Sequence, residues 1–307
     1  MHTYYAIRLA LKLSPHLSRP NGRRLCTVLG YLFYLVNASA RESITDNMRH
    51  VLGDDCPPRR LRRVVRRIFV NIVLDYYDMV LLSALSWEDA STLIEPHGLE
   101  QFRAARRQGR GVIAVFFHTS GYNLAGQIAM MGDWKGYIVA EPLHPPRIAG
   151  MVNRLRTAQG VELIPADRSG MRRIVRALRA NEIVGLAGDR DVNGTGIDVE
   201  LFGSCATLPA GVAALALRTG AVISPVHQQR RKDGGVRVWI GDPVECEDTG
   251  DFDEDVKRIT QEIAWRYECA LARRPSEWVM VQPAWRGCGR TQSREPLPSR
   301  KREIQRR

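Results

Sequence analysis

The sequence predicts an α/β fold: a single domain with a mostly parallel central sheet covered by helices, preceded by a helical N-terminal region. Strand-like and helix-like segments alternate from about residue 90 onward. Some strand-like segments, such as VIAVFF at 112–117, are apolar throughout, which is typical of strands that helices bury on both faces. We find no internal repeat and no linker that would divide this core, so one domain fits best.

The alternation gives a definite series of elements. Strands are expected at 111–118, 136–141, 161–165, 182–188, 198–202, 221–227 and 236–241. Helices are expected at 99–107, 121–131, 146–159, 169–180, 209–219 and 252–272. Pro209 suits the first position of a helix, because its fixed φ is already helical, and Gly220 suits a helix end.

Three regions follow: a helical region at 1–85, an α/β core at 86–285 and a basic tail at 286–307 that we expect to be disordered. Between 57 and 72, apolar residues recur at helical spacing with arginines mostly on the other side. This pattern fits a helix whose apolar side packs on the protein core and whose arginines face water. It also fits a basic amphipathic helix that lies on an anionic membrane surface. The uncharged run at 25–40 favours the membrane, although it is too short for a confident span.

The charge of the chain points to an anionic partner. The formal net charge is +12, and half of it lies between 286 and 307, where eight basic residues face two acidic ones. A polyanion or an anionic membrane surface is therefore expected. A nucleic acid ranks last among the partners, because the basic runs lack interleaved aromatic residues. Since no clean signal peptide is visible, we expect peripheral association with the cytoplasmic side of the inner (plasma) membrane.

No metal site is expected. The cysteines form no C-x-x-C pair, which argues against a zinc site. Residues 189–200 do satisfy the calcium-loop pattern D-x-[DN]-x-[DN]-G-x5-E. The flanking segments are strand-like instead of helical, so we reject calcium binding there.

His118 is the most informative residue. It ends the apolar strand in GVIAVFFHTSGYN (111–123), and a glycine turn and a helix follow at once. The C-terminal tip of a buried strand beside a helix N-terminus is where α/β proteins place catalytic groups. Considered without its context, His118 could instead be a core histidine whose ring hydrogen-bonds to the backbone.

FFHTSGYN resembles the H-x4-D/E motif of the glycerolipid acyltransferase superfamily. The stretch GDRDVNGTGIDVELFGSCATLPAGVAALALRTGAVISPV (188–226) is similar to the bacterial lipid A lauroyl/myristoyl acyltransferase family and its phosphatidylinositol mannoside acyltransferase branch. The resemblance implies O-acyl transfer from a thioester donor, acyl-CoA or acyl carrier protein, to a hydroxyl of a glycolipid or phospholipid, with no metal or other cofactor. His118 would be the general base.

The chain departs from the family at Asn123, where the motif has an acidic residue. That residue holds the imidazole in one tautomer and supplies a counter-charge. Three interpretations are open: another carboxylate replaces it, Glu200 first and then Glu141; Asn123 suffices for orientation; or the protein binds lipid without transferase activity. On this reading, His118, Asn123 and Glu200 form the catalytic set.

Four further residues are candidates for substrate binding: Glu141, Arg168, Asp189 and Arg190. Arg190 is suited to the phosphates of the substrate or donor, or else to a local ion pair with its acidic neighbours. Arg168 stands where a strand end meets a helix start, which is a natural anion site, although a solvated loop arginine fits equally well.

Overall fold

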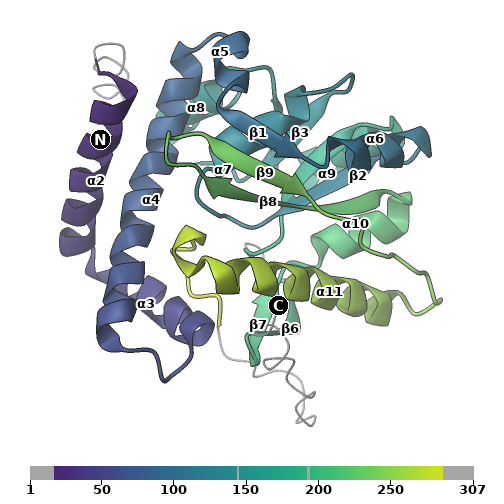
Figure 1. Ribbon diagram of the computed structural model, residues 1–307. Helices are drawn as coiled ribbons and strands as arrows, with labels where there is room; N and C mark the ends of the chain where they lie inside the picture. Colours follow the sequence, from purple (N-terminus) through teal and green to yellow (C-terminus); the bar gives the residue numbers. More distant parts are fainter. Residues whose placement is uncertain (1–16, 144, 192–193, 286–307) are drawn as a thin grey trace.

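The computed structural model describes residues 17–143, 145–191 and 194–285. Its centre is a seven-stranded sheet in the order β1-β9-β8-β2-β5-β3-β4. The five strands from β8 to β4 are parallel to one another, whereas β9 is antiparallel to β8 and parallel to β1. This is the mostly parallel sheet that the sequence predicts, covered by helices (Figure 1). The bounds of its strands are β1 Ile94–His97, β2 Val112–Phe116, β3 Gly136–Ala140, β4 Glu162–Pro165, β5 Ile183–Ala187, β8 Val222–Arg230 and β9 Val236–Ile240.

Strand β2 lies inside the sheet between β8 and β5 and is buried on both faces. Ile113 and Val115 pack into the larger hydrophobic cluster, together with residues of α9, α10 and α11. Val112 and Ala114 pack on the other side with Phe102 of α6 and Leu124 of α7. Burial of both faces explains why this segment is apolar at every position.

The helices of the core follow the predicted ones to within a few residues. Their bounds are α6 Leu99–Arg107, α8 Pro146–Arg156, α9 Arg168–Arg179, α10 Gly211–Thr219 and α11 Phe252–Arg273. The helix expected at 121–131 is divided: it begins as α7 Tyr122–Ala125 and continues as the 3-10 helix η2 Gly126–Met130. A short 3-10 turn, η3 Pro275–Glu277, follows α11.

Two parts of the strand pattern differ from the prediction. The strand expected at 198–202 is β6 Ile197–Leu201, but it pairs with β7 Ser204–Leu208 in a separate antiparallel hairpin and not with the central sheet. Residues 203–208 were not expected to form a strand. The edge strand β1 was also missed, because its four residues include a proline and two polar side chains that give no alternating pattern.

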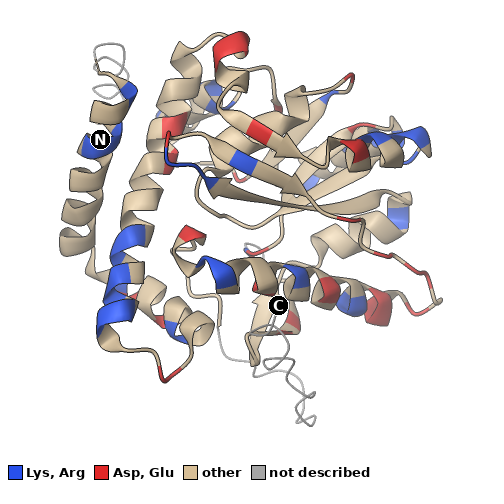
Figure 2. Ribbon diagram, viewed as in Figure 1, with Lys and Arg blue, Asp and Glu red and all other residues tan. Residues whose placement is uncertain are grey.

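The N-terminal region is helical, as predicted, over its described residues. It consists of α2 Arg19–Val36, α3 Ala38–Leu52, α4 Pro58–Ala84 and the short α5 Trp87–Ser91. Helix α4 lies between α2 and the rest of the protein, and Figure 2 shows basic residues along its first half. Residues 1–16 and the tail at 286–307 lie outside the described residues, so the predictions made for them stay predictions.

Helix α2 packs closely on α4 through a face of small residues. A Cβ on Gly30 would lie 2.5 Å from the Val70 Cα, and a Cβ on Gly22 would lie 2.5 Å from the Tyr77 hydroxyl oxygen. At Gly30, where the nearest atoms are backbone, only glycine permits this approach, since a side chain would require the two helices to separate. The opposite side of α2 carries exposed apolar residues, which we call the α2 apolar stripe: Leu25, Val28, Leu29, Leu32, Leu35 and Val36. Within the described ranges, no helix is both long enough and apolar enough to cross a bilayer.

Candidate active site

A cavity of about 980 Å³ lies at the end of the sheet where β2 and β5 terminate. Its walls are mostly apolar and include Met79 and Leu82 of α4 and Phe102 of α6. The polar side chains that reach it include His118, Glu141, Arg168 and Arg190. An apolar pocket with a few convergent polar groups is the usual form of a small-molecule site.

His118 follows β2 directly and lines this cavity with about a quarter of its side chain exposed. Its Nδ1 lies 2.8 Å from Oδ1 of Asp189. No other described residue hydrogen-bonds the ring, so Nε2 is left for a substrate. The rings of Phe116 and Tyr122 form T-shaped arrangements with the imidazole, with ring centroids 5.8 and 5.5 Å away. These contacts and the carboxylate fix the plane of the ring.

Asp189 is fully buried behind the histidine and is held by three N–H groups. Besides the ring contact, its Oδ2 accepts from the His118 backbone N–H at 2.8 Å and from the Trp278 indole N–H at 2.9 Å. Burial works to raise the pKa of Asp189, but the charge and hydrogen bonds of His118 and the bond from Trp278 outweigh it and hold the pKa below its usual value. The carboxylate is therefore ionised and accepts the Nδ1 proton, which leaves Nε2 as the basic nitrogen.

The partner of His118 is thus different from the three that the sequence suggested, Asn123, Glu200 and Glu141. Asn123 is buried and donates from its side-chain amide to the Asp75 carbonyl oxygen at 3.0 Å, so it links α7 to α4. Glu200 lies in the β6–β7 hairpin, where its backbone exchanges hydrogen bonds with Gln261 of α11. Asp189, expected to bind substrate, is instead sealed behind the imidazole and does not line the cavity.

Glu141, Arg168 and Arg190 lie at the cavity, and Asn123 also lines it. Arg190 donates to Glu141 at 3.0 Å, and both side chains are about 30% exposed. Arg168 begins α9 at the cavity wall, where Asp167 caps the helix by accepting from the Ser169 and Gly170 N–H groups. Arg168 and Arg190 thus place two guanidinium groups at the cavity wall, and Glu141 pairs with one of them.

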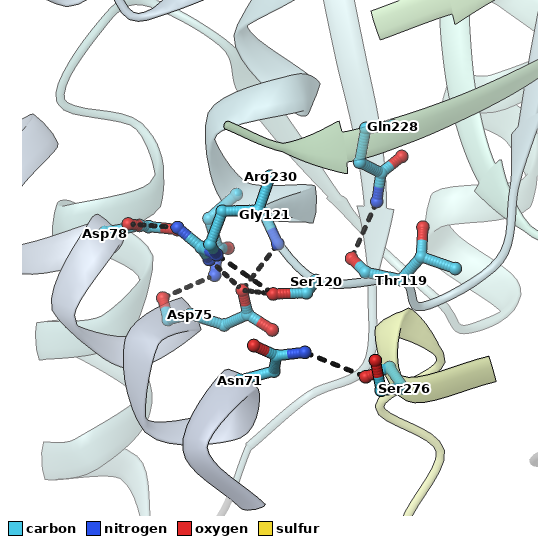
Figure 3. A network of polar contacts seen from close by, with 10 residues as sticks. Asn71, Asp75, Asp78, Thr119, Ser120, Gly121, Gln228, Arg230 and Ser276 are labelled. Carbon is cyan, nitrogen blue, oxygen red and sulfur yellow. Dashed lines mark hydrogen bonds and ion pairs between the residues drawn. The ribbon is translucent and has the colours of Figure 1, made fainter. Parts of the chain in front are cut away.

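The loop after His118 is fixed by a buried polar network (Figure 3). Asp75 of α4 accepts from the Gly121 N–H at 2.6 Å through Oδ1, and the same oxygen accepts from Arg230 at 2.6 Å. Gln228 donates to the Thr119 carbonyl oxygen at 2.7 Å. Gly121 adopts a φ of +88°, and a Cβ there would lie 2.4 Å from Val236, so the turn requires glycine.

Arg230 is the centre of this network. It also contacts Asp78 through two nitrogens at 3.1 and 2.6 Å and donates to the Ser120 hydroxyl at 3.0 Å. Burial raises the pKa of both Asp75 and Asp78, whereas the guanidinium lowers it. Two carboxylates and one guanidinium, each almost fully buried, therefore join α4, β8 and the loop that carries His118.

Sequence reasoning missed Asp75, Asp78, Arg230 and Trp278. A signal for the role of Asp189 was available, because it follows a buried strand just as His118 does. The carboxyl ends of neighbouring parallel strands meet at one edge of a sheet, but only the fold shows that β5 is the neighbour of β2. Trp278 lies 89 residues from Asp189 and carries no motif.

The fold and the site together define a class of protein. A histidine base backed by a buried carboxylate, facing a large apolar cavity, is suited to moving a group from an apolar donor to a hydroxyl. A sequence model of the bacterial lipid A biosynthesis acyltransferases matches residues 2–287. The chain belongs to this family, and it is an acyltransferase.

Three curated relatives point in the same direction. The chain is 29% identical to the phosphatidylinositol mannoside acyltransferase of Mycolicibacterium smegmatis over 248 residues, which cover 74% of this chain and 79% of the relative. It is 31% identical over 192 residues to the proteins of that name from two Mycobacterium tuberculosis strains, and this match covers 61% of the chain and 58% of each relative. The resemblance to the phosphatidylinositol mannoside acyltransferase branch is therefore confirmed.

Proposed function

We propose that this acyltransferase moves a fatty acyl chain from a thioester donor to a hydroxyl of a membrane glycolipid, with His118 as the general base. The supporting observation is the 2.8 Å contact between Nδ1 of His118 and the buried Asp189, with the ring lining the apolar cavity. That contact directs the other ring nitrogen toward the substrates. The cavity holds the acyl chain, which its apolar walls would solvate.

The proposed step is an acyl exchange. The acceptor oxygen attacks the thioester carbonyl carbon while Nε2 of His118 takes the hydroxyl proton. The C–S bond then breaks, and the imidazolium returns the proton to the leaving thiolate. Asp189 stabilises the imidazolium between the two proton transfers, as a carboxylate does in hydrolase triads. Atoms and charge balance with the two substrates alone, so the reaction as proposed needs no cofactor.

The chemistry of the cavity and the names of the relatives indicate which acceptor and donor molecules to test first. The relatives are named for acting on phosphatidylinositol mannosides, so we take such a glycolipid as the first acceptor to test. Acyl-CoA and acyl carrier protein both present phosphates beside the thioester arm. Arg168 and Arg190 at the cavity are placed to bind those phosphates.

The alternative function, a lipid-binding protein without transferase activity, rested on Asn123 in place of an acid. Asp189 supplies the carboxylate that Asn123 lacks. That reason for favouring the alternative is thereby removed, and catalysis is the better-supported proposal.

His118→Ala tests the proposal. We expect the rate of acyl transfer from palmitoyl-CoA or palmitoyl carrier protein to a phosphatidylinositol mannoside to fall by about 10²- to 10⁴-fold, the usual contribution of general base catalysis. Labelled product is measured in detergent. His227→Ala, on β8 and outside the cavity wall, is the matched control and should retain activity. Equal rates for wild type and His118→Ala would refute the mechanism.

We further propose that the enzyme binds the cytoplasmic face of the plasma membrane through the α2 apolar stripe. Its six residues are 43–79% exposed and lie within about 120° of the helix circumference at 3.6 residues per turn. The inner face of α2 is already packed on α4, so the stripe has no partner among the described residues. Exposed arginines on the first half of α4 add attraction to anionic lipid.

Leu32→Glu with Leu35→Glu tests the membrane proposal. Removing two leucines from lipid costs about 1.5–3 kcal/mol each, so we expect at least a tenfold loss of binding to vesicles of phosphatidylcholine and phosphatidylglycerol, measured by cosedimentation. Phe252→Glu, another exposed apolar position on α11, is the control and should bind as wild type does. Unchanged binding of the double variant would exclude α2 as the contact.

A further inference from the structure

Helix α9 carries a row of arginines beside the cavity, which we call the α9 arginine stripe: Arg168, Arg172, Arg176 and Arg179. All four are exposed, and their spacing places them within about 80° of one another around the helix. They span about 16 Å along the axis at 1.5 Å per residue. The helix itself contains no acidic residue, and none of the four forms an ion pair with any described carboxylate. The stripe is therefore an unneutralised line of positive charge.

One end of the stripe meets the cavity that holds His118. Arg168 and Met171 line the cavity wall, and Met171 is also 46% exposed at the surface. From Arg168 the other arginines follow α9 away from the cavity, with Arg179 at the far end of the helix. A partner bound along the stripe would thus have one end at the entrance to the site.

The apolar face of α9 is already in use. Ile174, Ala177 and Leu178 are buried in the hydrophobic core. A helix that lies on a membrane inserts its apolar face into the lipid, and α9 has no such face left. The stripe offers charge and hydrogen-bond donors, with Met171 as the large exposed apolar side chain of this helix. Figure 1 also shows α4 between α2 and α9. These features favour an acidic protein over a lipid surface.

We propose that the α9 arginine stripe is the docking surface for an acidic acyl carrier protein, which delivers the acyl chain through its thioester arm. The proposal deepens the proposed function and rests on it. The phosphates of a coenzyme A donor are clustered, so they would meet the arginines nearest the cavity. Arg176 and Arg179 lie about 12 and 16 Å further along the helix. An extended acidic surface, such as one face of a carrier-protein helix, can contact all four.

The test is the double variant Arg176→Glu with Arg179→Glu, which leaves the arginine at the cavity intact. We expect kcat/KM with palmitoyl carrier protein to fall at least tenfold at low salt, chiefly through KM. The loss should be smaller at high salt, because exposed charges at the edge of an interface steer and attract the partner through electrostatic forces that salt screens. With palmitoyl-CoA, kcat/KM should change by less than about twofold. The charge-matched control, Arg103→Glu with Arg107→Glu on α6, should affect neither donor.

Carrier-protein affinity is measured separately, by calorimetry on His118→Ala protein, so the result does not depend on turnover. A tenfold loss of affinity with the α9 variant supports docking even if no acceptor is acylated, in which case only the proposed function fails. Undiminished affinity refutes docking. An equal loss of turnover with both donors would also overturn it and assign the stripe to coenzyme A. Reduced binding to anionic vesicles would assign the stripe to the membrane instead.

Discussion

Asp189→Asn is expected to lower kcat by about 10⁴-fold, the loss that the same exchange causes in Ser-His-Asp proteases. The Asp189 carboxylate accepts three hydrogen bonds, two from His118 and one from the Trp278 indole. In an asparagine, the oxygen can keep the two donors at Oδ2, but the amide nitrogen then faces Nδ1. The imidazole would have to accept there, which places its proton on Nε2. The nitrogen in the cavity could no longer take a proton from an alcohol.

The measurement is steady-state acyl transfer with saturating donor, combined with a thermal unfolding midpoint to show that the variant folds. Asp198→Asn is the matched control, because Asp198 is a partly buried carboxylate of β6 that accepts from Thr207 and does not line the cavity. It should retain full activity. A loss of less than tenfold for Asp189→Asn in a folded protein would mean that His118 works without this carboxylate.

Arg230→Met is expected to lower the free energy of unfolding by about 3–5 kcal/mol, which is a large part of the stability of a typical domain. The change leaves Asp75 and Asp78 buried without their shared counter-charge. It also removes the donor to the Ser120 hydroxyl in the loop after His118 (Figure 3). Denaturant unfolding measures the effect. We expect a loss of activity as well, because this loop positions the base.

Two control variants test whether the loss of stability comes from the buried ion pairs of Arg230. Arg237→Met removes an arginine of the neighbouring strand whose side chain is half exposed and paired with Glu95, so it should cost less than about 1 kcal/mol. Adding Asp75→Asn and Asp78→Asn to Arg230→Met removes both uncompensated charges and should restore most of the lost stability. If Arg230→Met costs no more than Arg237→Met, the buried triad does not stabilise this fold.

Much of the fold was predictable from local patterns. The apolar strands around β2 and β5 and the amphipathic helices such as α9 are visible in the sequence, because burial on two faces or on one stripe fixes residue type at each position. Strand β6 was predicted as part of the main alternation and β7 was missed, since a single short strand does not reveal its partner. The edge strand β1 has too few apolar residues to be recognised.

The site was predictable only in part. His118, Glu141, Arg168 and Arg190 were predicted from their places at strand and helix ends, and the structure places all four at the cavity. The orienting group was assigned to Glu200, then Glu141, or to Asn123. Asn123 occupies the family's position, and Glu200 ends a polar, glycine-rich segment that could close over the same pocket. Distance along the chain does not measure distance in space: Asp189 is 71 residues from His118 and forms a 2.8 Å contact with it.

The sequence by itself determined the fold class and the family, and it singled out His118 as the proposed base, because strand and helix periodicity and a histidine at a strand end are local properties of the chain. The tertiary structure decided which carboxylate serves that base and what holds its loop. Those answers depend on strand order, which puts β5 and β8 on either side of β2. They also depend on burial, which strengthens the contact of Asp189 with His118 and the ion pairs of Arg230 with Asp75 and Asp78. Strand order and burial arise only when distant segments pack together.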